Sequence, residues 1–114
     1  MLRHSWTNDD ITPEPDYAVR AVRLARLGNE PYEGGAWVIV DPHTTMTEHV
    51  NPVGETEIFY VIEGSGTLVV GQESSVVRPG DSVLIPPGER HRLHNDADTP
   101  LRMLALWWGA GSDG

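Results

Sequence analysis

The stretch that decides the fold is residues 49–64, HVNPVGETEIFYVIEG. Its first half carries an imidazole, an amide and two carboxylates, and its second half is a run of β-branched and aromatic residues that stops at Gly64. A short apolar run of this composition, ending at a glycine turn, predicts a β-strand. The stretch therefore predicts a polar site that leads directly into a strand.

A second stretch of similar make-up follows at residues 80–95, GDSVLIPPGERHRLHN. It predicts another strand, a corner built from two prolines and a glycine, and then a histidine. We expect the two stretches to fold together so that His49, Glu57 and His91 point at one metal ion inside a small β-barrel.

The length, cysteine content and net charge of the chain limit the size of the fold and the class of partner. The chain has 114 residues, enough for one domain with a hydrophobic core, and no cysteine, so any metal must be held by nitrogen and oxygen ligands. Its net charge of -9 repels phosphate backbones and anionic lipids, which argues against nucleic acid and membrane partners. Without an apolar leader or a long apolar run, the sequence predicts a cytoplasmic protein.

The chain divides into an arm, a domain and a tail. Residues 1–16 are polar and punctuated by prolines, which predicts an extended arm whose Trp6 docks against the domain or a partner subunit. Residues 17–108 form the predicted single domain, and residues 109–114 a flexible tail. Residues 17–27 fit either a helix with a stripe of arginines or an edge strand. We favour the strand because all later elements are predicted to be β-strands.

The rest of the chain consists of short strands with frequent turn signals. This spacing is typical of an all-β sandwich or barrel, and no segment has the helical period that a βαβ unit needs. The fold class is therefore predicted to be all-β. Beyond the opening stretch, the expected strands are residues 36–40, 67–70, 73–78, 81–85 and 101–108.

Strand alternation indicates which polar residues face inward. It puts Glu57 on the same face as Phe59 and Val61, and His91 on the same face as Leu93. An inward carboxylate is costly unless it is paired, hydrogen-bonded or bound to metal. Two imidazoles and one carboxylate suit a divalent ion and leave positions open for water or substrate. The alternative is that His91 is a satisfied core histidine and Glu57 a buried salt-bridge partner.

The two stretches together resemble the paired sequence motifs of the cupin family. The second motif is a glycine, five residues, Pro-x-Gly, two residues, a histidine, three residues and an asparagine, matched here by Gly80, Pro86, Gly88, His91 and Asn95. The first is a His-x-His, a glutamate and a later glycine, carried by His49, Glu57 and Gly64. The resemblance spans residues 43–108 and implies a small antiparallel β-barrel, the jelly-roll-like double-stranded β-helix.

The chain departs from the first motif at one ligand position. Asn51 stands where the family usually has its second histidine, and an amide oxygen is a weaker metal ligand than an imidazole. Asn51 could ligate weakly or orient a water, or Glu55 or Glu48 could supply the ligand, or the site could have lost its metal. The resemblance implies one divalent transition metal, Fe, Mn, Zn or Ni, and the expected ligands are His49, Asn51, Glu57 and His91.

The implied function is a metal-dependent enzyme of oxygenase, isomerase or lyase type that acts on a small organic molecule inside the barrel. Tyr60 and Glu55 are the candidate catalytic residues, and His94 is a further proton-transfer candidate. The expected lining aromatics are Trp37, Phe59, Trp107 and Trp108. The alternative function is a non-catalytic module that binds or senses a small ligand. A homodimer is expected, with residues 1–27 crossing to the neighbour.

Overall fold

The computed structural model of the chain describes residues 1–111, and nearly all of its regular structure is β-strand. One turn of 3-10 helix, η1 (Asn8–Asp10), precedes the strands. The strands are β1 (Thr12–Glu14), β2 (Val19–Arg23), β3 (Gly34–Val40), β4 (Thr44–His49), β5 (Thr56–Glu63), β6 (Gly66–Val70), β7 (Glu73–Val77), β8 (Ser82–Ile85), β9 (His91–Asn95) and β10 (Leu101–Trp108). The predicted all-β class is confirmed. Within residues 1–111, no helix is long and apolar enough to cross a bilayer.

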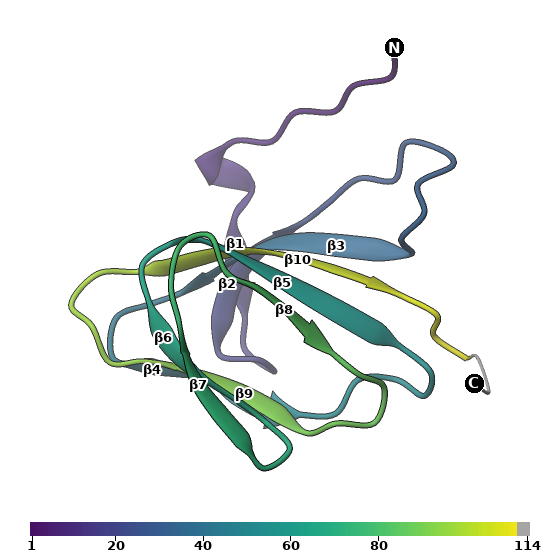
Figure 1. Cartoon of the computed structure of the whole chain (residues 1–114). Helices are drawn as coiled ribbons and strands as arrows, with labels where there is room; N and C mark the ends of the chain where they lie inside the picture. The colour runs from purple at the N-terminus through teal and green to yellow at the C-terminus, as the bar shows by residue number, and fades with distance from the viewer. Residues whose placement is uncertain (112–114) are drawn as a thin grey trace.

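Two antiparallel sheets face each other and enclose the core (Figure 1). The larger sheet has six strands in the order β1-β2-β3-β10-β5-β8, and the smaller one has four in the order β4-β9-β6-β7. The chain passes repeatedly from one sheet to the other, as in a jelly roll. The predicted small antiparallel barrel is therefore confirmed.

The core between the sheets is apolar. Val40, Leu101 and Met103 of the six-stranded sheet, and Leu68 and Leu93 of the four-stranded sheet, are each at most 3% exposed. Full burial of one such side chain contributes about 1.5–3 kcal/mol to folding. Because strand side chains alternate between faces, this core also fixes which positions of every strand point inward.

Gly64 turns the end of β5 towards β6 with a φ of +79°. A Cβ here would collide with the carbonyl oxygen of Pro100 and lie 2.9 Å from Cα of Leu101. Only glycine adopts this φ at low cost and leaves room for the neighbouring backbone. The glycine that closes the opening stretch thus lets the end of β5 lie against the start of β10.

The N-terminal region contributes more to the barrel than the sequence predicted. Residues 12–14, expected to belong to the extended arm, form β1 and pair with β2 in the register Thr12↔Ala21. Trp6 packs on Trp37 with ring centroids 5.9 Å apart, so it docks against its own domain. The strand favoured for residues 17–27 is confirmed over the shorter range of β2, Val19–Arg23. Residues 112–114 of the predicted tail lie outside the described residues.

Candidate metal centre and cavity

The register of the smaller sheet brings two histidines together. His49 ends β4 and lies opposite His91, the first residue of β9, after a register shift between Met46 and His49. The two ring centroids are 4.3 Å apart, and the rings are inclined by 59°. Side chains that are forty-odd positions apart in the sequence therefore meet at one end of the barrel.

Both imidazoles are held in the same tautomer. The Nδ1–H of His49 donates to the carbonyl of Thr47 at 2.7 Å, and that of His91 donates to the carbonyl of Glu89 at 3.1 Å. A carbonyl can only accept, so Nδ1 must carry the proton and the neutral ring keeps a lone pair on Nε2. Metal-binding histidines are commonly oriented in this way by a backbone carbonyl.

The Nε2 atom of His91 is buried without a hydrogen-bond partner. The side chain is fully buried, and burial lowers the pKa of His91, which keeps the ring neutral. Its nearest acidic neighbour is Glu57, whose Oε1 lies 3.7 Å from Nε2. An unsatisfied buried polar atom costs about 1–3 kcal/mol, so this lone pair is set to receive a proton or a cation.

Glu57 faces these histidines from β5 in the other sheet and is only 8% exposed. Its carboxylate accepts a hydrogen bond from Nδ2 of Asn51 at 3.0 Å. The pKa of Glu57 is raised to about 7, mainly by burial and also by the nearby charge of Glu55, against the lowering effect of the Asn51 hydrogen bond. In the metal-free protein Glu57 is therefore partly protonated at neutral pH.

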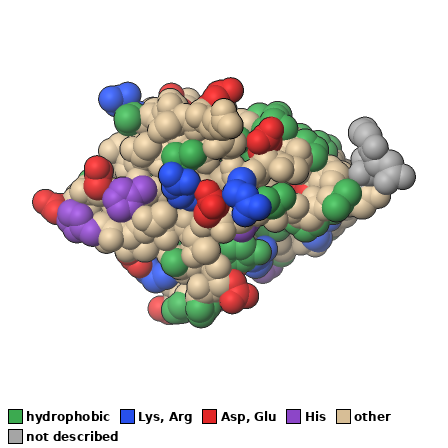
Figure 2. All heavy atoms as spheres, turned by 90° about the horizontal axis from the view of Figure 1, so that it is seen from below, with side chains coloured by type: hydrophobic (Ala, Val, Ile, Leu, Met, Phe, Trp, Pro, Cys, Tyr) green, Lys and Arg blue, Asp and Glu red, His purple; other side chains and the backbone are tan. Residues whose placement is uncertain are grey.

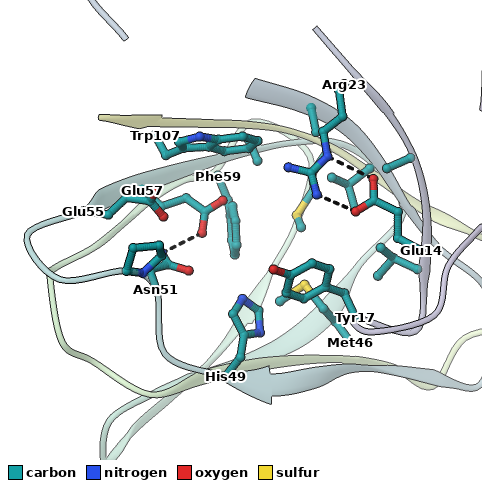
Figure 3. A pocket seen from close by; sticks show the side chains of 17 residues that line it. Glu14, Tyr17, Arg23, Met46, His49, Asn51, Glu55, Glu57, Phe59 and Trp107 are labelled. Atoms are coloured by element: carbon teal, nitrogen blue, oxygen red, sulfur yellow. Dashed lines mark hydrogen bonds and ion pairs between the residues drawn. The ribbon is translucent and has the colours of Figure 1, made fainter. Parts of the chain in front are cut away.

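A cavity of about 210 Å³ lies between the two sheets beside these groups (Figure 3). Ala36 and Ala105 face each other across β3 and β10, and their small side chains leave the space open. Phe59 and Trp107 form aromatic walls. The full lining is Glu14, Tyr17, Val19, Ala21, Arg23, Ala36, Val38, Met46, His49, Asn51, Pro52, Glu55, Glu57, Phe59, Met103, Ala105 and Trp107.

The rim of the cavity holds residues that sequence reasoning missed. Arg23 donates two hydrogen bonds to the carboxylate of Glu14, from Nε at 3.0 Å and from Nη2 at 2.5 Å, and its guanidinium lies 5.3 Å from the ring centroid of Trp107. Tyr17 packs edge-on against His49 at 4.8 Å (Figure 3). The alternation of Val19, Ala21 and Arg23 in β2 was the available signal, since it places Arg23 on the inward face.

Glu55 is one of the two predicted catalytic residues, and it lines the cavity. It is 8% exposed, and burial raises its pKa, with a smaller contribution from the charge of Glu33. The other predicted catalytic residue, Tyr60, does not line this cavity. It lies on the face of β5 opposite Glu57, because odd and even residues of a strand point to opposite sides.

Strand alternation also places two further polar candidates and two aromatic residues outside the cavity lining. Glu48 pairs with Arg92 at 2.9 Å outside the barrel, and His94 contacts Oγ1 of Thr45 through Nδ1. Neither lines the cavity, and the carboxylate of Glu48 is instead bonded to Arg92. Of the expected aromatics, the two that lie outside the lining are Trp37 and Trp108.

The polar residues of the site offer ligand atoms of the kind that a divalent cation binds. A neutral imidazole nitrogen of His91 and a carboxylate oxygen of Glu57 face each other at 3.7 Å, and two ligands that bind one ion at about 2.0–2.2 Å lie roughly 3–4 Å apart. Within residues 1–111, however, no three His, Asp or Glu side chains are already arranged around one point. The structure thus holds two facing donors, with His49 and Asn51 beside them, rather than a complete ligand shell.

The substitution Asn51→His is expected to tighten metal binding by at least about tenfold, because imidazole is a better transition-metal ligand than an amide. The side chain at position 51 already reaches Glu57 at 3.0 Å, so it stands close enough to contribute. Titration calorimetry with Zn²⁺ and Mn²⁺ measures the change. Asn51→Ala is the control for loss of the Glu57 hydrogen bond, and an unchanged affinity in Asn51→His would contradict the prediction.

Comparison with known proteins agrees with this architecture. A family model described as Cupin domain matches residues 36–107. An uncharacterized protein of Methanocaldococcus jannaschii is 31% identical over 70 residues, which are 53% of this chain and 56% of that protein. The tetracenomycin polyketide synthase protein TcmJ of Streptomyces glaucescens is 30% identical over 63 residues, which are 55% of this chain and 42% of that protein. The chain thus spans about half the length of these curated relatives.

A solved structure of a cupin barrel superposes on nearly the whole chain. The Cupin 2 conserved barrel domain protein of Salinispora arenicola superposes with a TM-score of 0.81 at 31% identity, over 96% of this chain and 90% of that one. The family match includes both polar stretches, and the barrel joins them at one end as described above. On the family match, the shared barrel and the paired motifs, the chain belongs to the cupin family.

Proposed function

We propose that this cupin is a metal-dependent enzyme that acts on a small, partly apolar organic molecule inside the barrel. The observation that carries the proposal is the buried, unpartnered Nε2 of His91, which lies 3.7 Å from Oε1 of Glu57, a residue that lines the cavity. Orphaned buried polar atoms are rare in folded proteins and call for a bound group. A pocket that combines apolar walls with a few converging polar groups is the usual form of a small-molecule site.

The proposed metal ligands are His49, Glu57 and His91, with the amide of Asn51 as a weaker fourth. When bound, a divalent ion supplies Lewis-acid polarisation of a substrate oxygen, or dioxygen activation if the ion is iron. The chain itself prepares the site. Backbone carbonyls fix the two imidazole tautomers, and Asn51 orients the carboxylate of Glu57.

Glu55 is the proposed proton-transfer residue. It lines the cavity without belonging to the proposed ligand set, and its raised pKa moves it towards the range in which a carboxylate can take up and release a proton near neutral pH. At the rim, the pair of Arg23 with Glu14 packs on Trp107 and narrows the mouth of the cavity. These residues would exclude water and orient the substrate.

The proposed substrate is a flat molecule of one or two rings that carries oxygen substituents. The cavity of about 210 Å³ is smaller than the roughly 300–1,000 Å³ typical of drug-sized ligands. Its aromatic walls, Phe59 and Trp107, suit a planar apolar body, and its polar end suits hydroxyl or carbonyl oxygens. The relation to a protein named as a polyketide synthase protein supports this class, because polyketide chemistry handles such molecules.

A second candidate function is a binding module that takes up the same class of molecule without turning it over. It is favoured by Asn51 in place of a histidine and by the lack of three converged donors within the described residues. In this case the cavity would work without a metal, and Glu57 would be a buried, hydrogen-bonded carboxyl group.

We expect protein purified without a histidine tag to contain close to one divalent transition metal per chain, measured by inductively coupled plasma mass spectrometry. Aromatic hydroxy and keto compounds are then incubated with the metal-loaded and the chelated protein, and product is followed by mass spectrometry. Turnover that is lost on chelation and restored by one metal supports the enzyme. Saturable ligand binding without product, in protein free of metal, would decide for the binding module.

A further inference from the structure

The cavity between the sheets is lined by three carboxylates and one arginine. All eight basic residues of the chain are arginines, and among the described residues only Arg23 belongs to the lining. On the outer face of the four-stranded sheet the charges are instead mixed with histidines (Figure 2), and Arg92 pairs there with Glu48. Arg23 is therefore the one permanently charged cation that a molecule in this cavity can meet within residues 1–111.

The guanidinium of Arg23 is held in place with one edge left open. Its Nε and Nη2 donate to the two carboxylate oxygens of Glu14, and its central carbon lies 5.3 Å from the ring centroid of Trp107. A guanidinium has five N–H donors, so both donors of Nη1 and one of Nη2 are not used by Glu14. In Figure 3 the Nη1 nitrogen points away from Glu14. A second planar acid group can therefore bind the open edge of an arginine that is already oriented.

One inward-facing row of the larger sheet connects this arginine to the strand that carries Glu57. Its members, in order from β2 through β3 and β10 to β5, are Arg23, Ala36, Ala105 and Phe59. Three strand spacings of about 4.8 Å place the backbones of β2 and β5 about 14 Å apart. Because the two central side chains are alanines, a flat ring can lie over them, with one edge at Arg23 and the other towards β5.

We propose that Arg23 binds a carboxylate of the substrate, which makes the substrate class an aromatic acid. The inference rests on the proposed function, which supplies the reacting oxygen at the Glu57 end of the cavity, and it adds an acid group at the opposite end. The side chain of Arg23 is 56% exposed, so the bound acid stays partly hydrated and loses little solvation. A monoanion fits better than a phosphate dianion, because Glu14 and the other two lining glutamates repel the larger charge more strongly.

Titration calorimetry with matched pairs of probes tests the proposal. The pairs are para-hydroxybenzoate with para-hydroxybenzamide, and a hydroxynaphthoate with its amide, so that each pair has the same shape and differs in charge. The protein is treated with a chelator, because a carboxylate could otherwise bind to a metal ion. Near neutral pH, where the acids are ionised, at least one acid is expected to bind at least about tenfold more tightly than its amide, since its hydrogen bonds to Arg23 are charge-assisted.

Arg23→Gln is expected to abolish the preference for the acid. It is expected to leave the affinity for the amide within about threefold, because the aromatic walls are unchanged and only a neutral hydrogen bond is lost. The matched control is Arg20→Gln, which makes the same change in the same strand. Arg20 pairs with Asp41 at 2.8 Å and does not line the cavity, so this variant is expected to keep the preference.

Three results would overturn the proposal: neither acid is preferred by the unaltered protein, the preference survives Arg23→Gln, or Arg20→Gln removes it as well. A loss of affinity for acid and amide alike in Arg23→Gln would also overturn it, because Arg23 would then only support the fold. These measurements involve neither metal nor turnover. Their failure therefore leaves the metal-dependent reaction standing, and a protein that binds no metal leaves the acid preference measurable.

Discussion

His91→Ala is expected to lower the metal affinity of this cupin by at least about 100-fold. The substitution removes the buried Nε2 that faces Glu57 at 3.7 Å, and loss of a direct ligand must cost more than the roughly 10–100-fold typical of a residue that only supports a ligand. Titration calorimetry and metal content by mass spectrometry both measure the effect. Metal content that is unchanged in His91→Ala would defeat the proposed metal centre.

The control for this variant lies in the same strand. His94→Ala removes another imidazole of β9, but one that points out of the barrel and contacts Thr45. It is expected to leave metal affinity within about twofold of the unaltered protein, because it neither lines the cavity nor approaches Glu57. Equal losses in both variants would mean that the strand was disturbed rather than the ligand removed.

The free energy of unfolding of the metal-free protein is expected to fall as the pH rises from about 4.5 to about 7, on the order of 3 kcal/mol in all from Glu57. Burial raises the pKa of Glu57 from 4.5 to about 7 in the folded protein. Over this range the carboxyl group of Glu57 ionises in the unfolded chain but not in the folded one. The unfolded state is therefore stabilised relative to the folded state. The contribution is fully present below pH 4.5 and is lost above pH 7.

Denaturant unfolding in the presence of a chelator, from pH 4 to 8, measures this loss. Glu57→Gln is the matched variant, because glutamine has nearly the same shape, accepts the Asn51 hydrogen bond and does not titrate. The difference in unfolding free energy between the two proteins isolates Glu57 from all other groups. Parallel curves would show that Glu57 titrates alike in the folded and unfolded states.

Alternation along single strands predicted which polar residues of the site point inward. It placed Glu57 with Phe59 on an inward face and His91 beside Leu93, and the structure has all four inside the barrel. The same rule argues against Tyr60, which follows Phe59 directly and therefore points outward. That candidate rested on its chemistry alone, although the alternation in the sequence already placed it on the face opposite Glu57.

The positions of other cavity-lining residues could not be predicted from strand periodicity. Glu14 and Tyr17 line the cavity because β1 folds back on β2 and the carbonyl of Tyr17 accepts a hydrogen bond from the amide of Thr47 at 2.9 Å. These are contacts between segments that the sequence leaves independent. Aromatic residues were equally ambiguous, since Trp107 lines the cavity while its neighbour Trp108 faces outward.

The sequence by itself determined the all-β class, the two motif stretches and the inward direction of Glu57 and His91, because turn residues and a two-residue period act locally. Only the tertiary structure decided that His49 lies opposite His91, that Ala36 pairs with Ala105 beside the cavity, and that Arg23 lines that cavity. The register between strands far apart in the chain sets these distances, and register is fixed by the packing of the whole barrel.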